Sequence, residues 1–254
     1  MKDAAMWQLA CREVRVLQQL APSAHTHIAN MLAVHEDTAA LHLVLEYCDG
    51  GSLQRLLHRL GVSIGLPEPT AAALTAQLAS GLTHCHHHGV SHRDLKPSNV
   101  VLVDGGGSGG GGSGCPRVKL VDFGFAIACG DERCHTKCGT PSYMAPEQNR
   151  QTPSYLGPPV DCWALGALLF EMLVGKPAFN GGGLAQIAQR IRTASYEPWN
   201  GRTPVSAEAK AVVRWILTCD PAQRPRMNTI ADHPFVVAGR RGERTDADAL
   251  VHQG

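Results

Sequence analysis

The sequence has almost no excess of charge of either sign. Its 254 residues contain 23 Lys and Arg against 22 Asp and Glu, which leaves a formal net charge of +1. A protein that holds a nucleic acid or an anionic membrane through bulk charge needs a strong positive excess. The composition therefore argues against nucleic acid and membrane as partners.

Long apolar runs and a secretion signal are also missing. No apolar stretch approaches the roughly 18 residues that a membrane helix needs. The start, "MKDAAMWQLACREVRVL", carries Arg12, Glu13 and Arg15 within a helical rhythm, unlike the apolar centre of a signal peptide. The nine cysteines are odd in number and have no repeating spacing, which favours reduced thiols over a disulfide framework. These absences predict a soluble protein of the cytoplasm or nucleus.

An apolar content of 44% is ordinary for a globular protein and excludes general disorder. Apolar residues recur at helical or strand spacing over most of the chain. The expected helices cover residues 6–20, 52–60, 70–88, 161–175, 182–193 and 206–220, with a last short element at 231–236. The expected strands cover residues 28–36, 41–47, 99–103 and 117–123, the last two forming a hairpin.

The order of these elements predicts an α+β protein with two lobes. Residues 1–48 would form a small lobe with one helix and two strands. Residues 49–238 would form a mainly helical large lobe, and residues 239–254 a polar tail. The glycine-rich tract Asp104–Gly114 has almost no side chains to pack, so we expect a loose hairpin tip, although it also resembles an engineered linker.

The stretch "VSHRDLKPSNV" at Val90–Val100 is too polar to lie in a core. Phosphoryl transfer needs a carboxylate that accepts the proton of the nucleophile, a cation, and oxygen ligands for Mg²⁺. Asp94, Lys96 and Asn99 could supply one of each. A single Asn is a poor magnesium site, and Asp122 in "VDFG" is the candidate for a second oxygen ligand.

Three short motifs follow one another in the order "HRDLKPSN", "DFG" and "APE". Together they resemble the ordered motif set of the eukaryotic-type protein kinases. The resemblance runs from about Glu13 to about Phe235. A lysine in "DLKP" resembles the pattern of serine/threonine-specific kinases rather than that of tyrosine-specific ones. It implies a two-lobed kinase fold, ATP and Mg²⁺ as cofactors, and a protein substrate with a Ser or Thr acceptor.

The resemblance also implies roles for single residues. Asp94 would be the catalytic base, Lys96 would contact the transferring phosphate, and Asn99 with Asp122 would hold the metal ions. "VLEYCDGG" resembles the hinge between the lobes, with Leu45 as gatekeeper. The residues expected to contact the nucleotide are Glu46 and Cys48 through their backbones, Ser52, Val101 beneath the base, and Glu13.

The activation segment would run from Asp122 to Glu147. Thr136 matches a position that an upstream kinase phosphorylates in many of these enzymes, and a phosphate there would pair with Arg93. Thr140 would support the base and Lys96. Structural roles are implied for three residues: Glu147 paired with Arg224, and Asp161 anchoring the catalytic loop.

Blander interpretations exist for several of these residues. Asp94 and Asn99 are residue types that favour turns, and Thr136 could be an ordinary exposed threonine. "HCHHHG" at His84–Gly89 and "CHTKC" at Cys134–Cys138 suggest metal ligands. Neighbouring histidines on a helix point in different directions and "CHTKC" offers only three ligands, so a solvated helix end and a plain loop are favoured.

Two parts of the family pattern are not found ahead of Glu13. No G-x-G-x-x-G motif precedes it, and Lys2 is the sole lysine there, on what reads as the same helix. In kinases these parts cover and position the phosphates of ATP. The sequence therefore predicts an incomplete small lobe. Three explanations stay open: a fragment of a longer kinase, a catalytically dead scaffold that binds partners, or an enzyme completed by another segment.

Overall fold

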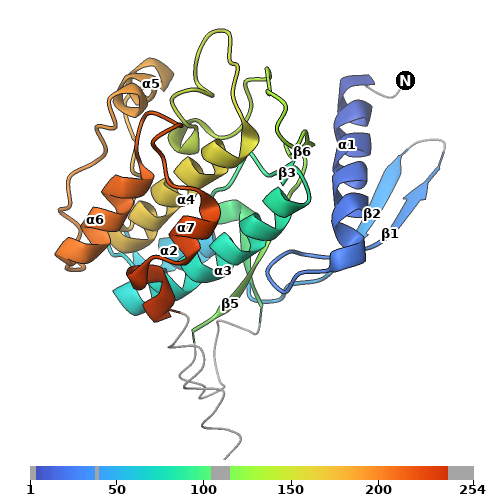
Figure 1. Cartoon of the computed structure of the whole chain (residues 1–254). Coiled ribbons are helices and arrows are strands. Elements are labelled where there is room, and N and C mark those ends of the chain that lie inside the picture. Colours follow the sequence, from blue (N-terminus) through green and yellow to red (C-terminus); the bar gives the residue numbers. More distant parts are fainter. Residues whose placement is uncertain (1–3, 38–39, 104–114, 240–254) are drawn as a thin grey trace, which may run out of the picture.

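The computed structural model of the chain describes residues 4–37, 40–103 and 115–239. Lys2, the tract Asp104–Gly114 and the tail after Arg240 lie outside the described residues. Figure 1 shows one helix and a two-stranded hairpin standing beside a larger helical body. The small part contains α1 (Ala4–Leu20), η1 (Ala21–Ser23), β1 (Met31–Glu36) and β2 (Leu41–Leu45).

The larger body combines helices with short strands. Its helices are α2 (Leu53–Leu60), α3 (Glu68–His87), α4 (Gly157–Val174), α5 (Leu184–Arg192), α6 (Ala207–Ile216) and α7 (Met227–Ala231). Its other elements are β3 (Val90–Ser91), η2 (Pro97–Asn99), β4 (Val100–Val103), β5 (Arg117–Leu120), β6 (Ile127–Ala128) and η3 (Pro141–Tyr143). The ends of the long helices lie within four residues of their predicted positions.

Helix α1 forms because its apolar residues recur on one face. Val14, Leu17 and Leu20 are buried, whereas Arg15 on the opposite face is exposed. The helix contacts both β1 and β6. Glu13 therefore lies between the small part and the strand that follows the "DFG" motif.

The first predicted strand starts later than expected. β1 begins at Met31 and pairs antiparallel with β2, with Val34 opposite Leu43. Ile28 instead forms a parallel bridge with Leu120, and the Ala29 amide donates to the Leu120 carbonyl at 3.0 Å. The prediction of one continuous strand from residue 28 is wrong because tertiary pairing with β5 captures its first residues.

The core of the larger body is built around α3 and α4, which contact each other. α4 is apolar on nearly all sides, and the ring of Trp163 stacks on that of Phe179 at 5.4 Å. By length and composition alone this helix could cross a membrane, which corrects the expectation that no stretch approaches that length. The structure buries 83% of it inside the protein.

The hairpin of β4 and β5 positions the polar loop. The strands pair antiparallel with Val100 opposite Leu120, as predicted. Beyond this pair the Val121 amide donates to the Asn99 carbonyl at 3.0 Å. Asp122 then adopts a positive φ of 62°, which turns the chain away and ends the strand. Asn99 and Asp122 consequently lie at the same end of the hairpin.

Candidate active site

The loop His92–Asn99 is held from below by a carboxylate of the buried helix α4. Asp161 accepts hydrogen bonds from the backbone amides of His92 at 3.0 Å and Arg93 at 2.8 Å. Its Oδ2 also contacts His86 Nε2 at 2.8 Å. Burial alone would raise the pKa of Asp161, but these hydrogen bonds lower it below its ordinary value. An ionised carboxylate thus fixes the backbone of this loop.

The loop backbone is in the left-handed region at Arg93, a conformation that surrounding contacts must stabilise. Arg93 has a φ of 63°, which is uncommon for a residue with a side chain. On its other side, Gly139 approaches so closely that a Cβ atom there would lie 2.7 Å from the Arg93 carbonyl oxygen. The glycine of "CGTP" therefore lets the segment before Thr140 pack against the loop His92–Asn99.

Asp94, Lys96 and Thr140 form a closed triangle of polar contacts. Lys96 Nζ lies 2.6 Å from Asp94 Oδ2, and the Thr140 hydroxyl donates to Asp94 Oδ1 at 2.7 Å. Lys96 Nζ also donates to Thr140 Oγ1 at 3.0 Å. Asp94 Oδ2 also accepts Asn99 Nδ2 at 3.3 Å, whereas Oδ1 has the Thr140 hydroxyl as its donor and keeps a further lone pair. The arrangement can accept a proton from a hydroxyl group while a cation lies beside it.

The two expected metal ligands differ in exposure, because Asn99 is buried and Asp122 is exposed. Asn99 Nδ2 donates to the Asp94 carbonyl at 3.0 Å, which orients the amide, and Asn99 Oδ1 accepts a long hydrogen bond of 3.4 Å from the Ser98 hydroxyl. Asp122 is exposed, and its Oδ1 accepts the Gly124 amide at 3.3 Å. Amide and carboxylate oxygens are the donors that Mg²⁺ prefers. The donor chemistry of Asn99 and Asp122 therefore fits a magnesium ion.

Glu13 reaches the same region from helix α1. Its carboxylate accepts a hydrogen bond from the Phe123 backbone, and burial followed by the charge of Asp122 raises its pKa. In residues 4–37, 40–103 and 115–239 no Lys or Arg forms an ion pair with Glu13. The described site thus has two neighbouring carboxylates and lacks the cation that usually faces the helix glutamate in kinases.

The expected hinge has a side-chain contact that the sequence did not suggest. Glu46 Oε2 accepts the Asn30 amide at 3.1 Å and lies 3.0 Å from Lys119 Nζ on β5. Burial opposes ionisation of Glu46, but the hydrogen bonds from Asn30 and Lys119 and the charge of Lys119 together lower its pKa below the ordinary value. The contact fixes the hinge to β5, and the neighbouring Cys48 is half-buried.

Ser52 and Val101 face each other across a backbone bridge at the base of the expected nucleotide site. The Ser52 hydroxyl caps α2 by accepting the Arg55 amide at 3.2 Å. A capping oxygen still has its own proton to donate. Ser52 can therefore serve the helix and offer a hydrogen bond to a ligand hydroxyl.

Thr136 and Arg93 are connected through a residue that sequence reasoning missed. Arg93 is buried, and its Nη1 donates to the Tyr155 hydroxyl at 3.3 Å. That hydroxyl donates to the Thr136 carbonyl at 2.7 Å. The structure places Thr136 on the exposed surface and Tyr155 between it and Arg93. No spacing in the sequence marks Tyr155, because it belongs to none of the motifs.

Glu147 and Arg224 meet in a buried ion pair although 77 residues separate them. Arg224 Nη1 and Nη2 donate to the two carboxylate oxygens at 2.7 and 3.0 Å. The guanidinium carbon also lies 5.1 Å from the centre of the Trp163 ring. Gln148, the next residue, contacts the Cys138 carbonyl at 2.8 Å and the Arg93 carbonyl at 3.4 Å. Gln148 and Trp163 are contacts that the motifs did not predict.

The histidine-rich end of α3 has several separate contacts. His86 faces Asp161, whereas the rings of His84 and His88 pack against each other with centroids 4.4 Å apart. Within the part of the chain that the structure describes, no group of three or more His, Cys, Asp or Glu is placed to hold a metal ion. Cys134 and Cys138 contact Cys129 and Tyr155, respectively.

Comparison with known proteins agrees with this geometry. The protein kinase domain model matches residues 1–236. Sperm motility kinase 3A of Mus musculus is 31% identical over 229 residues, 90% of this chain and 42% of that protein. Calcium-dependent protein kinase 9 of Oryza sativa subsp. japonica is 35% identical over 230 residues, 89% and 37% of the two chains. Serine/threonine-protein kinase PLK4 of Nematostella vectensis is 32% identical over 238 residues, 93% and 22% of the two chains.

The chain belongs to the protein kinase domain family, and its relatives are serine/threonine kinases. This confirms the predicted family and the predicted α+β fold, with an incomplete strand-bearing small lobe and a helical large lobe. The chain spans less than half the length of each of these relatives.

Proposed function

We propose that this chain transfers the γ-phosphoryl group of ATP to serine or threonine hydroxyls of a protein substrate in a Mg²⁺-dependent reaction. The triangle of Asp94, Lys96 and Thr140 carries the proposal, because it combines a buried carboxylate with an adjacent cation. The names of the relatives support serine/threonine specificity.

Each polar residue of the site has a task in this reaction. Asp94 accepts the proton of the substrate hydroxyl, and its fixed oxygens orient that hydroxyl. Lys96 neutralises charge on the phosphoryl oxygens, and Thr140 holds both side chains in place. Asn99 and Asp122 would hold Mg²⁺, which when bound neutralises phosphate charge. The backbones of Glu46 and Cys48, with Ser52 and Val101, would receive the nucleoside.

Regulation by an upstream kinase is a second part of the proposal. Thr136 is exposed, so its hydroxyl is accessible to another enzyme. The Tyr155 hydroxyl bridges the Arg93 guanidinium and the Thr136 backbone carbonyl through two hydrogen bonds. A phosphate on Thr136 would draw the guanidinium from Tyr155 into a charge-assisted hydrogen bond and so tighten the activation segment.

A kinase-shaped binding module is the second candidate function. Two observations favour it, and the first is that the carboxylates of Glu13 and Asp122 are neighbours, with no described cation paired to Glu13. The exposed apolar residues Leu32, Val44 and Tyr47 also lie on or beside the small-lobe hairpin, where a partner could cover them.

Phosphoryl transfer from labelled ATP to a mixture of acceptor proteins, with and without Mg²⁺, tests the proposal. We expect Mg²⁺-dependent labelling that falls by about 10²- to 10⁴-fold in Asp94→Asn. Asp131→Asn, at an exposed position, is the matched control and should label like the wild type. Equal activity in Asp94→Asn would show that Asp94 is not the base. A folded wild-type chain that labels nothing would favour the binding module.

A further inference from the structure

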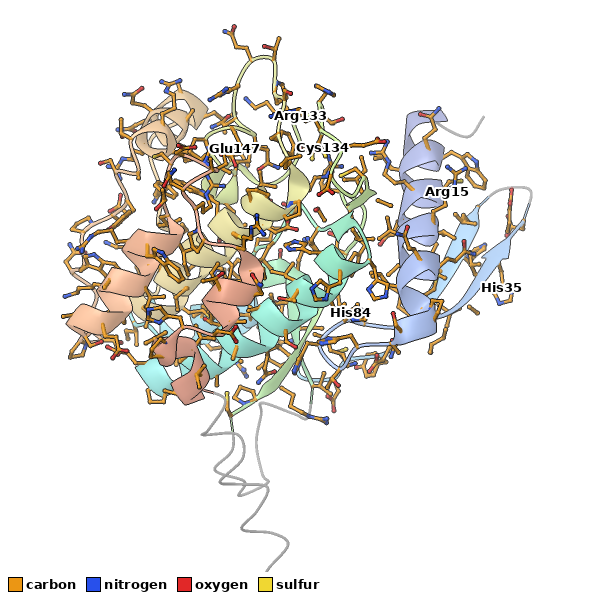
Figure 2. All side chains as sticks on the ribbon, viewed as in Figure 1. Arg15, His35, His84, Arg133, Cys134 and Glu147 are labelled. Atoms are coloured by element: carbon orange, nitrogen blue, oxygen red, sulfur yellow. The ribbon has the colours of Figure 1, made fainter. Side chains whose placement is uncertain are left out.

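Two thiols of the activation segment lie within contact of each other. Cys129 Sγ and Cys134 Sγ are 3.5 Å apart, and the two residues are five positions apart in the chain. Cys129 directly follows β6, and Figure 2 shows Cys134 beside Arg133 on the adjacent loop. The phosphoryl-transfer chemistry proposed above uses neither thiol.

Backbone hydrogen bonds fix both cysteines. The Cys129 amide donates to the Gly89 carbonyl at 3.1 Å, and the Glu132 amide donates to the Cys129 carbonyl at 2.8 Å. Cys134 and Tyr155 exchange two hydrogen bonds of 2.7 and 3.1 Å. A disulfide requires a sulfur separation of about 2.0 Å, so the two sulfur atoms would have to approach each other by about 1.5 Å.

We propose that Cys129 and Cys134 are a reversible disulfide site that exchanges with low-molecular-weight disulfides such as glutathione disulfide. The two thiols lose two protons and two electrons as the Sγ–Sγ bond forms. One glutathione disulfide accepts both electrons and both protons and is reduced to two glutathione thiols. Its S–S bond is the bond that breaks.

The exposure of the two sulfurs sets the order of the exchange. Cys134 is buried at 3% relative exposure, whereas Cys129 is only partly buried. Cys129 therefore attacks the small disulfide, and Cys134 then displaces the second glutathione from the mixed disulfide. Burial, together with Cys134, raises the pKa of Cys129 to about 12. Exchange is consequently slow at neutral pH and accelerates as the pH rises.

The disulfide would restrain the segment that leads to Thr136. Cys134 pairs through its backbone with Tyr155, and the Tyr155 hydroxyl contacts both Arg93 and the Thr136 carbonyl. A covalent link across residues 129–134 fixes the chain immediately before these contacts. The redox state of the pair is thereby coupled to the geometry around Thr136.

Mass spectrometry can identify this link because Arg133 lies between the two cysteines. The full chain is equilibrated at pH 8 in glutathione buffers of rising disulfide content, quenched with acid, alkylated and digested with trypsin. Oxidation should join the peptide of residues 120–133 to that of residues 134–137. The joined mass should disappear after treatment with dithiothreitol. Cys138 falls in the separate peptide 138–150, so pairing with it gives a different mass.

Two variants sharpen the result. Cys134→Ser should lose the joined mass, and Cys138→Ser should keep it at the wild-type level. The proposal is overturned if both cysteines remain alkylated in the most oxidising buffer. It is also overturned if the joined mass involves Cys138, or if only mixed disulfides with glutathione accumulate. None of these readouts depends on ATP, so they are independent of the proposed kinase activity.

Discussion

The carboxylates of Glu13 and Asp122 flank Gly124 from two different elements. A Cβ atom on that glycine would lie 3.2 Å from Asp122 Oδ1 and 3.8 Å from Glu13 Oε2. Burial and the charge of Asp122 both raise the pKa of Glu13. The two carboxylates therefore concentrate negative charge that a bound cation would relieve.

Glu13→Gln should stabilise the protein at neutral and alkaline pH. A carboxyl whose pKa is raised by folding destabilises the folded state once the pH exceeds its ordinary pKa, and this cost grows until the pH passes the raised pKa. We expect a gain of about 0.5 kcal/mol at pH 8, a small value because the side chain is partly solvated. The gain should vanish at pH 4.

Urea denaturation at the two pH values measures this difference. Glu132→Gln is the control, because that carboxylate is exposed and should show no gain. A loss of stability in Glu13→Gln at pH 8 would contradict the repulsion between Glu13 and Asp122.

Arg224→Ala should destabilise the protein strongly. The substitution leaves the Glu147 carboxylate buried without its partner, and it also removes the contact with Trp163. Breaking a buried pair in this way costs about 3–5 kcal/mol in free energy of unfolding. Arg226→Ala, two residues away and exposed, should change it by less than about 0.5 kcal/mol. Equal stability of the two variants, measured by chemical denaturation, would show that the pair contributes little.

Asp161→Asn should loosen the catalytic loop. An amide has one acceptor oxygen, so it cannot accept both backbone hydrogen bonds from His92 and Arg93 as well as the contact with His86. We expect hydrogen exchange at the amides of residues 92 and 93 to accelerate by about 10- to 100-fold, the equivalent of a hydrogen bond to a charged group. Asp232→Asn at an exposed position should leave exchange at these amides unchanged. Unchanged hydrogen exchange at these amides in Asp161→Asn would show that Asp161 does not anchor the loop.

Acid should weaken the contact between the small lobe and α3. Burial, followed by His27 and His84, lowers the pKa of His25 to about 4. A histidine whose pKa folding depresses contributes its stability above its ordinary pKa of about 6.5, and the contribution is lost as the pH falls toward 4. For this partly exposed ring we expect about 1 kcal/mol after allowance for solvent screening.

Unfolding free energies between pH 7.5 and pH 4 test this expectation. His25→Gln should lose less stability over the range than the wild type. His58→Gln, at an exposed site, should follow the wild type. Parallel curves for wild type and His25→Gln would show that His25 is not responsible.

The sequence predicted the helices and the β4–β5 hairpin well because the spacing or length of their apolar runs and the glycines that bound them are local information. The predicted start of β1 was wrong because Ile28 pairs with Leu120, a contact between segments far apart in the chain. The motifs brought Asp94, Lys96, Asn99 and Asp122 to attention, and the structure gathers them, but their catalytic roles stay predictions. The contacts of Tyr155 and the contact between Cys129 and Cys134 form only in the folded chain, and no sequence motif predicts them.

Titration of Mg-ATP into the purified chain by calorimetry tests the central claim most directly. The account predicts saturable binding to the wild type that is lost in Asp122→Ala, because that variant removes a metal ligand. Asp131→Ala, also exposed but in the following loop, should bind like the wild type. A folded wild-type chain that releases no binding heat and gains no thermal stability from Mg-ATP would contradict the account, as would equal affinity in Asp122→Ala.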